Sequence, residues 1–388
     1  MNNRILHRAF VALFTLNSSL LTLLACSPEP PLHLYDAQEA DMNLPVIDLD
    51  LEVFWNYDVD IDYDWTQEWY YGWDDADRVI FGELGYTEPT VFNLRRYYTG
   101  NEPYAKHTGV IANTVEGNHF LGRYDWGFWD ILCWNDIQTL DGVQSLVFDE
   151  TTSLDSVVAY TNQTMHPSRY QAPRYTHSFY EPELLFSTYE QAIEVNRDLR
   201  GFVWDPERNA YVRTLKTMLR PITYIYLTQV ILHNNRGRIT AIDGSGNLSG
   251  LARSTNVNTG RAGNDAITVY YNTRMKRDCN KDGELVDIVG GRLMTFGLPG
   301  HSPYNISRAN EVTDQNRHFM DVNMQFNNGL DSTFVFDVTN QVRQRYRGGV
   351  ITVELNLDTI PIPSRSGGSG FDAVVEETKD GGTHEFEM

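Results

Sequence analysis

Asp278, Asn280 and Asp282 are spaced like the oxygen ligands of a cation-binding loop. They form a D-x-N-x-D-G sequence, the start of the pattern in which a calcium loop places ligands at its first, third and fifth positions. The twelfth position, where such loops carry a bidentate glutamate, is Val289. Two interpretations stay open: a calcium site of these three side chains, with Asp287 as a substitute ligand, and a polar hairpin turn.

Aromatic side chains are concentrated just before position 74, where they could stack on sugar rings. The set consists of Trp65, Trp69, Tyr70 and Trp73, with carboxylates as neighbours. Tryptophan and tyrosine rings suit glycan stacking, but they also suit core and rim packing of a β-domain, because they bury a large apolar area with one polar end. Glycan binding by this set is therefore one hypothesis, and packing is its alternative.

Catalytic motifs are missing from the sequence. It has no G-x-S-x-G, H-E-x-x-H or G-x-x-x-x-G-K, and no G-x-G-x-x-G before a helix. Carboxylates are plentiful enough to include a glycosidase pair, but abundant acid in a strongly acidic chain is weak support. We expect a protein that is not an enzyme, with an envelope hydrolase as the least favoured alternative.

Cys26 stands between an apolar N-terminal segment and a proline-rich one. Arg4 and Arg8 provide a basic start, residues 9–25 are mostly apolar, and the small residue Ala25 directly precedes the cysteine. This order is typical of a lipoprotein signal. A transmembrane helix is the alternative, but the apolar run is shorter than the roughly 20 residues that a span needs. We expect covalent diacylglycerol and an N-acyl lipid on Cys26, and no other cofactor.

The net charge of the chain limits the classes of molecule that it can bind. The formal net charge is −21, and the part from Cys26 onward carries 29 Lys and Arg against 52 Asp and Glu, or −23. Nucleic-acid binding requires basic patches, so this balance argues against it. The remaining cysteines, Cys133 and Cys279, lie far apart in sequence. We expect them to be free thiols, although an oxidising compartment would permit a bridge.

Alternating patterns indicate which elements position these residues. Apolar and acidic residues alternate over 47–53, and apolar and polar residues alternate over 320–326 and 351–357, as in antiparallel strands with one wet face. Residues 224–232 form an apolar run that suits a strand buried on both faces. Residues 78–81 are a further strand candidate. No long amphipathic helix is indicated, so the fold class is all-β.

Composition divides the chain into segments. About 360 residues after the signal suggest two domains. The region 162–212 lacks clean alternation, and 187–195 within it could form a short helix. We predict the following order: signal 1–25, flexible tether 26–45, N-terminal β-sandwich 46–165, connecting segment 166–212, C-terminal β-sandwich 213–365, and a Gly-rich acidic tail 366–388 with one extra strand at 371–375.

Several phrases resemble a family of Bacteroidetes-type lipoproteins related to fimbrial anchor and assembly (fimbrillin-like) proteins. The resemblance extends over residues 26–375. It rests on the phrases at 122–135 (GRYDWGFWDILCWN), 248–260 (LSGLARSTNVNTG), 295–297 (TFG), 336–342 (FDVTNQV), 360–363 (IPIP) and 370–372 (GFD).

The resemblance implies two transthyretin-like Greek-key β-sandwiches in tandem. It also implies an outer-membrane, surface-exposed anchor or accessory subunit whose partners are fimbrial subunits joined by β-strand addition. The chain departs from the family in its stretch 162–212 and in its acidity.

A cleavage site for removal of the first strand is missing. Shaft subunits of this class are thought to lose an N-terminal strand by cleavage at an arginine. Here there is no Lys or Arg between Cys26 and Arg78. We therefore predict that the strand over 47–53 and the lipid on Cys26 both stay attached, which suits an anchor better than a shaft subunit.

Overall fold

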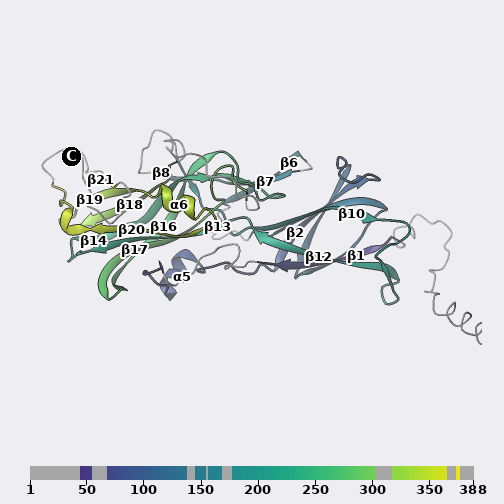
Figure 1. The fold of residues 1–388 in the computed structure, drawn as a ribbon, viewed down its shortest axis with the longest axis horizontal. Coiled ribbons are helices and arrows are strands. Elements are labelled where there is room, and N and C mark those ends of the chain that lie inside the picture. Colours follow the sequence, from purple (N-terminus) through teal and green to yellow (C-terminus); the bar gives the residue numbers. More distant parts are fainter. Residues whose placement is uncertain are drawn as a thin grey trace, which may run out of the picture.

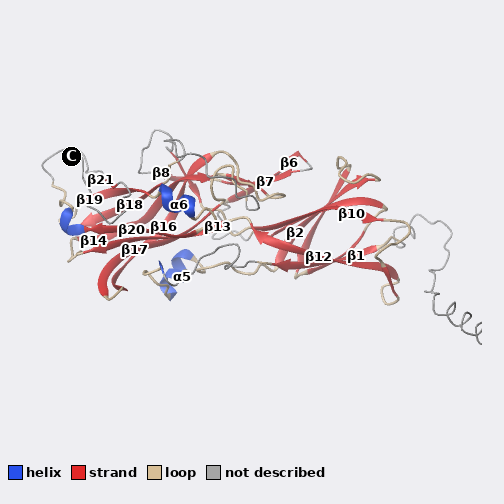
Figure 2. Cartoon of the chain, viewed as in Figure 1, coloured by secondary structure: helices blue, strands red, loops and turns tan. Residues whose placement is uncertain are grey.

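The computed structural model describes residues 44–54, 68–137, 145–153, 156–167, 177–302, 317–364 and 373–375. These residues form an elongated, strand-rich molecule with two β-rich bodies arranged end to end (Figures 1 and 2). The all-β prediction is confirmed. Cys26, Trp65 and the predicted signal and tether up to residue 43 lie outside the described residues.

The N-terminal body is a sandwich of two layers joined at a corner. One layer has the order β3 (Gly109–Glu116), β2 (Val91–Gly100), β5 (Gly127–Asn135) and β10 (Phe186–Val195). The other has the order β11 (Val203–Asp205), β12 (Ala210–Pro221), β1 (Val46–Val53) and β4 (His119–Arg123). The layers meet where β10 and β12 pair over Phe186–Pro221 and Ser187–Arg220, and they diverge beyond.

Strand β1 lies inside its layer. It runs parallel to β12 over eight register pairs and antiparallel to β4 over five. Ile47 and Leu49 are fully buried between the layers, as their alternation predicts. The polar face of β1 meets counter-charges, with Glu52 accepting a hydrogen bond from Lys216 Nζ at 3.0 Å. The first strand is thus an integral part of the sandwich.

The C-terminal body contains the longer strands. Its path is β20 (Gly349–Asn356), β13 (Tyr224–His233), β17 (Glu284–Thr295), β16 (Ala266–Lys281), β14 (Ile239–Ala252), β18 (Phe319–Phe326), β19 (Asp331–Asp337) and β21 (Ala373–Val375). Strand β13 is buried over nine of its ten residues, as its apolar run predicts. The expected tail strand is present as β21, which runs parallel to β19. Short helices α6 (Thr339–Gln344) and η2 (Leu357–Thr359) flank β20.

Shorter strands join the two bodies. Strand β7 (Ser156–Thr161) pairs with β6 (Leu146–Ser153) on one side and with β15 (Ser254–Asn256) on the other. Strand β8 (Gln163–Pro167) pairs with β9 (His177–Tyr180), and β9 runs parallel to β16. Buried side chains from both bodies form a shared core here, including Trp134, Leu185 and Phe296.

The predicted segment boundaries differ from the strand pairing. The region 166–212 is not a simple connection, because β10 pairs with β5 and β12 pairs with β1. The short helix expected at 187–195 is a strand, and the strand expected at 78–81 is part of helix α5 (Asp75–Phe81). Among the described residues, none of the helices has the length and apolar character needed to cross a membrane.

Residues 68–90, which we call the strap, connect the N-terminal body to the face of the C-terminal sheet. Its helix α5 packs against β16 and β17, and in Figure 1 it lies away from the N-terminal sandwich to which β1 and β2 belong. The side-chain amide of Gln229, fully buried on β13, donates to Glu68 O at 2.6 Å and accepts from Tyr70 N at 3.1 Å. The strap therefore replaces solvent over the middle of this sheet.

Candidate functional site

The predicted calcium residues lie in the hairpin that joins β16 to β17. Asp278 and Asp282 have positive φ of 54° and 52°, and Asn280 Oδ1 accepts a hydrogen bond from Gly283 N at 2.8 Å. Asp282 Oδ2 accepts from the Tyr70 hydroxyl at 3.3 Å. Across the described ranges there is no group of three or more His, Cys, Asp or Glu side chains placed to hold a metal ion. The geometry is that of a polar hairpin turn, and calcium binding stays a prediction.

The predicted aromatic set packs within the strap. Trp69 is 9% exposed and donates from Nε1 to Gly72 O at 2.8 Å. Its ring lies 5.3 Å from that of Tyr71, and the half-buried Trp73 lies 5.5 Å from Phe81. These rings cover the sheet and do not form an open stacking platform. Glycan binding through this set stays untested.

A buried ion-pair cluster fastens the strap to β16, and we call it the latch. Asp77 is fully buried and receives hydrogen bonds from Arg274 Nη1 at 2.7 Å, Tyr71 Oη at 2.7 Å, and Lys276 Nζ. Lys276 Nζ also lies 4.1 Å above the Tyr71 ring, a cation–π geometry. Asp74, the N-cap of α5, accepts from Arg274 at 2.8 Å. The latch therefore joins side chains about 200 positions apart.

The protonation of Asp77 follows from this cluster. Burial raises the pKa of its carboxyl, but hydrogen bonds from Lys276, Tyr71 and Arg274 outweigh burial, so the net pKa lies below the ordinary value. Burial and the hydrogen bond to Asp77 raise the pKa of the Tyr71 hydroxyl. At neutral pH the latch thus holds one buried carboxylate against two cations and a neutral phenol.

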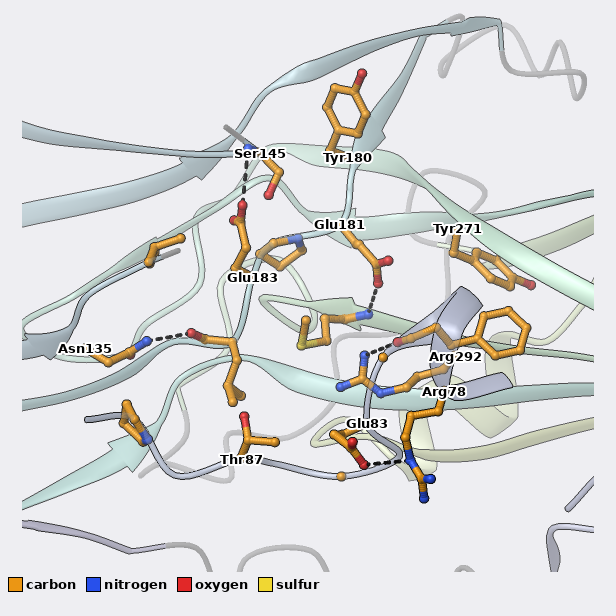
Figure 3. Close-up of a pocket in the computed structure, with 18 of the residues that line it drawn as sticks. Arg78, Glu83, Thr87, Asn135, Ser145, Tyr180, Glu181, Glu183, Tyr271 and Arg292 are labelled. Carbon is orange, nitrogen blue, oxygen red and sulfur yellow. Dashed lines mark hydrogen bonds and ion pairs between the residues drawn. The ribbon is translucent and has the colours of Figure 1, made fainter. Parts of the chain in front are cut away.

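A pocket of about 840 Å³ lies where the strap meets the junction of the two bodies (Figure 3). The strap forms one wall between Arg78 and Thr90, and strands β16 and β17 contribute Tyr271 and Arg292. The segment before β10 contributes Glu181 and Glu183. This volume is within the usual range for small-ligand sites.

Two glutamates give the pocket its chemical character. Glu181 accepts a hydrogen bond from Met294 N at 2.8 Å, and Glu183 accepts from Ser145 N at 3.3 Å. Burial raises the pKa of Glu181 to about 7, against the lowering effect of Arg292. Arg292 Nε donates to the strap carbonyl of Leu84 at 3.2 Å. The pocket can accept hydrogen bonds, and its environment favours the neutral form of the Glu181 carboxyl.

The two described cysteines are free thiols. Cys133 is fully buried on β5 and Cys279 is half-buried on β16. Burial raises the pKa of both, so neither thiol is activated. The expectation of unpaired thiols at these positions is confirmed.

Sequence reasoning missed the latch and the pocket. The latch left one local signal, the pair of aspartates at 74 and 77 that forms a capping box at the start of α5. The local signal of the pocket is the Glu-Pro-Glu sequence at 181–183. The partners of both, on β16 and β17, are reached only through the fold.

Comparison with known proteins gives structural neighbours only. No protein-family model matches the chain, and no curated protein matches it. A candidate adhesin from Bacteroides ovatus is 12% identical, with a TM-score of 0.49 over 86% of this chain and 98% of that one. A candidate adhesin from Bacteroides thetaiotaomicron is 9% identical, with a TM-score of 0.42 over 81% and 93%. The fimbrial anchor protein Mfa2 from Porphyromonas gingivalis is 10% identical, with a TM-score of 0.39 over 80% and 90%. These neighbours are of the kind that the sequence phrases resemble.

Proposed function

We propose that this chain is a non-catalytic lipoprotein of the outer membrane, displayed at the cell surface by the lipid on Cys26. Within that location it acts as a fimbrial anchor or accessory subunit. Its partners are fimbrial subunits that join it by β-strand addition. The resemblance of the sequence phrases motivates this proposal, and one feature of the fold supports it.

That feature is the position of β1 between β12 and β4. A strand inserted between two neighbours is held by ladder hydrogen bonds on both sides, and β1 also buries Ile47, Leu49 and Leu51. Because no Lys or Arg lies between Cys26 and Arg78, cleavage after a basic residue leaves β1 and the lipid on the same piece of the chain. The lipid is therefore joined to an intact sandwich, as an anchor requires.

Strand β3 offers an edge for an incoming strand. It pairs with β2 over eight register positions, and the described residues give it no ladder partner on its other side. Val110 and Ile111 are each 43% exposed on it. An edge strand with exposed apolar side chains is a template for strand addition, which gains main-chain hydrogen bonds and side-chain contacts together.

The mass of the mature surface protein tests the anchor role. We expect a chain that begins at an acylated Cys26 and still contains β1. A mature protein that starts after Arg78 or Arg95 would refute it, because the lipid and β1 would both be lost.

Edge substitutions test the strand addition. We expect the double variant Val110→Lys, Ile111→Lys to abolish co-purification of a fimbrial subunit that runs as a ladder of oligomers on a gel. Val79→Lys is the matched control, because Val79 is 87% exposed on α5, which packs against β16 and β17 of the C-terminal body. Co-purification that survives the edge substitutions would show that subunits join elsewhere.

A further inference from the structure

The described chain begins at the free end of the N-terminal sandwich, opposite the C-terminal body (Figure 1). Leu44 O accepts a hydrogen bond from Arg123 Nη1 at 3.3 Å, and Pro45 O accepts from Tyr124 N at 3.0 Å. The 17 residues between Cys26 and Leu44 span up to about 60 Å when extended. A lipid on Cys26 would thus keep this end near a membrane but would not orient the molecule.

Two of the segments at this end form a surface that we call the base. They are the β4–β5 loop, 123–126, and the run 196–213 that contains β11 and the start of β12. Val203 is 73% exposed on β11. Trp204 packs edge-on against Tyr211 with ring centroids 5.1 Å apart, and both rings are only half-buried. The base therefore presents apolar and amphipathic side chains to the exterior.

The base also departs from the charge of the rest of the chain. Its two segments carry five arginines and four acidic residues, whereas the whole chain has a net charge of −21. The Arg200 side chain is 83% exposed and lies 3.4 Å from the exposed Asp198 carboxylate, and Arg197 is exposed beside it. Arginine forks suit lipid phosphates, and half-buried tryptophan and tyrosine suit the headgroup region. The remainder of the chain is acidic, so an anionic surface repels it.

We propose that the base docks on the anionic lipid headgroups of the membrane that holds the molecule. This inference rests on the proposed lipid anchor at Cys26 and adds a second contact to it. Val203 and Trp204 enter the headgroup layer while Arg197 and Arg200 meet phosphates. The lipid on Cys26 and the base then both hold the same end of the molecule at the membrane. The long axis therefore points away from the membrane, with the C-terminal body at the outer end.

Depth-dependent quenching tests the docking. The full lipidated protein carries one label, at Val203→Cys or at Leu285→Cys, in a Cys279→Ser background; Leu285 is 70% exposed in the β16–β17 hairpin of the other body. The vesicles contain phosphatidylethanolamine and phosphatidylglycerol with a spin-labelled headgroup as quencher. We expect quenching at position 203 and none at 285. In protein that floats with the vesicles, equal quenching at the two positions, or none at either, would overturn the proposal.

Charge-reversal variants test whether the arginines of the base, rather than arginines elsewhere on the protein, bind the anionic lipid. We expect Arg197→Glu with Arg200→Glu to remove the quenching at position 203, while the exposed Arg236→Glu on the C-terminal body leaves it unchanged. Replacing the anionic lipid with phosphatidylcholine should have the same effect as the base variant. Quenching that survives the reversal would show that the base does not contact phosphates. If Cys26 carries no lipid, the protein fails to float with vesicles at all, which would refute the anchor and not the base.

Discussion

Arg274 donates a hydrogen bond from Nη1 to Asp77 Oδ1 at 2.7 Å, and this contact fastens the strap of the N-terminal half to the C-terminal sheet. The carboxyl is fully buried, whereas the Arg274 side chain is 32% exposed. A buried charge is tolerated when its partners are close and well oriented. The latch therefore fixes how the two bodies meet.

Loss of the Asp77 charge should weaken the whole molecule. We expect Asp77→Asn to lower the free energy of unfolding by about 3–5 kcal/mol, because Arg274 and Lys276 lose their buried counter-ion. Asp75→Asn is the control, since the Asp75 side chain is fully exposed, and its effect should stay within about 0.5 kcal/mol. Urea unfolding measures both.

The stabilities of the wild type and of Asp77→Asn should become equal in strong acid. The folded pKa of Asp77 is below its ordinary 3.8, so its contribution is present above pH 3.8 and is lost as pH falls through the folded value. A stability difference between wild type and Asp77→Asn that persisted in strong acid would contradict the ionised latch.

The close packing of Tyr71 on Gly290 provides a second way to test how the strap is held. A Cβ at this position would lie 2.4 Å from Tyr71 Cδ2, so Gly290→Ala must displace the strap at a cost of about 1–3 kcal/mol. We expect faster tryptic cleavage after Arg78. Gly109→Ala is the control because nothing lies within 4 Å of its added Cβ. Unchanged cleavage would mean that the strap accommodates the methyl group.

Glu181 should make the protein more stable in mild acid. Its folded pKa of about 7 is above the ordinary 4.5, so its ionisation opposes folding. The contribution of Glu181 to the free energy of unfolding is therefore most favourable below pH 4.5, and it is lost as pH rises through 7. We expect Glu181→Gln to stabilise the protein by about 1–3 kcal/mol at pH 8 and to have little effect at pH 5. Thermal melts at the two pH values measure it, and equal effects would contradict the raised pKa.

The aromatic side chains should matter for stability more than for sugars. We expect Trp69→Ala to destabilise the protein by about 3–5 kcal/mol and Trp73→Ala by less, because Trp73 is half-buried. Affinity electrophoresis in polysaccharide gels tests the glycan hypothesis directly. Retardation that disappears in folded Trp69→Ala and Trp73→Ala variants would favour glycan binding over packing.

Calcium should leave the β16–β17 hairpin unchanged. We expect titration calorimetry to give no saturable heat and the melting temperature to stay constant, because Asn280 already caps Gly283. A ligand at 100 times its Kd would add about 2.7 kcal/mol of stability. A rise in melting temperature that Asp282→Asn abolishes would establish the calcium site.

Sequence patterns predict strands where one physical effect dominates. Strict alternation predicts β1, and continuous apolarity predicts β13, because burial alone fixes those patterns. Strand β10 escapes prediction because Ala192 has φ of 55° and the pairing with β5 shifts register between Glu190 and Ile193. The apolar residues of α5 look like a strand when the Asp74 cap is overlooked.

The sites depend more strongly on the fold. Local sequence reveals the hairpin at 278–283 as a polar turn or a cation loop. It does not reveal that Arg274 and Lys276 meet Asp77, because nothing near position 77 encodes contact with a strand about 200 positions later. The pocket has the same origin, since its walls come from the strap, the junction and β17.

The pairing of β1 with β12 has a consequence for how the chain acquires its structure. Val46 is opposite Val212, so the first strand cannot complete its ladder until some 160 further residues have been synthesised. Parallel pairing across such a separation carries a large loop-closure entropy and slows folding. We expect late, cooperative folding, in which the two bodies acquire their native contacts together rather than in order of synthesis.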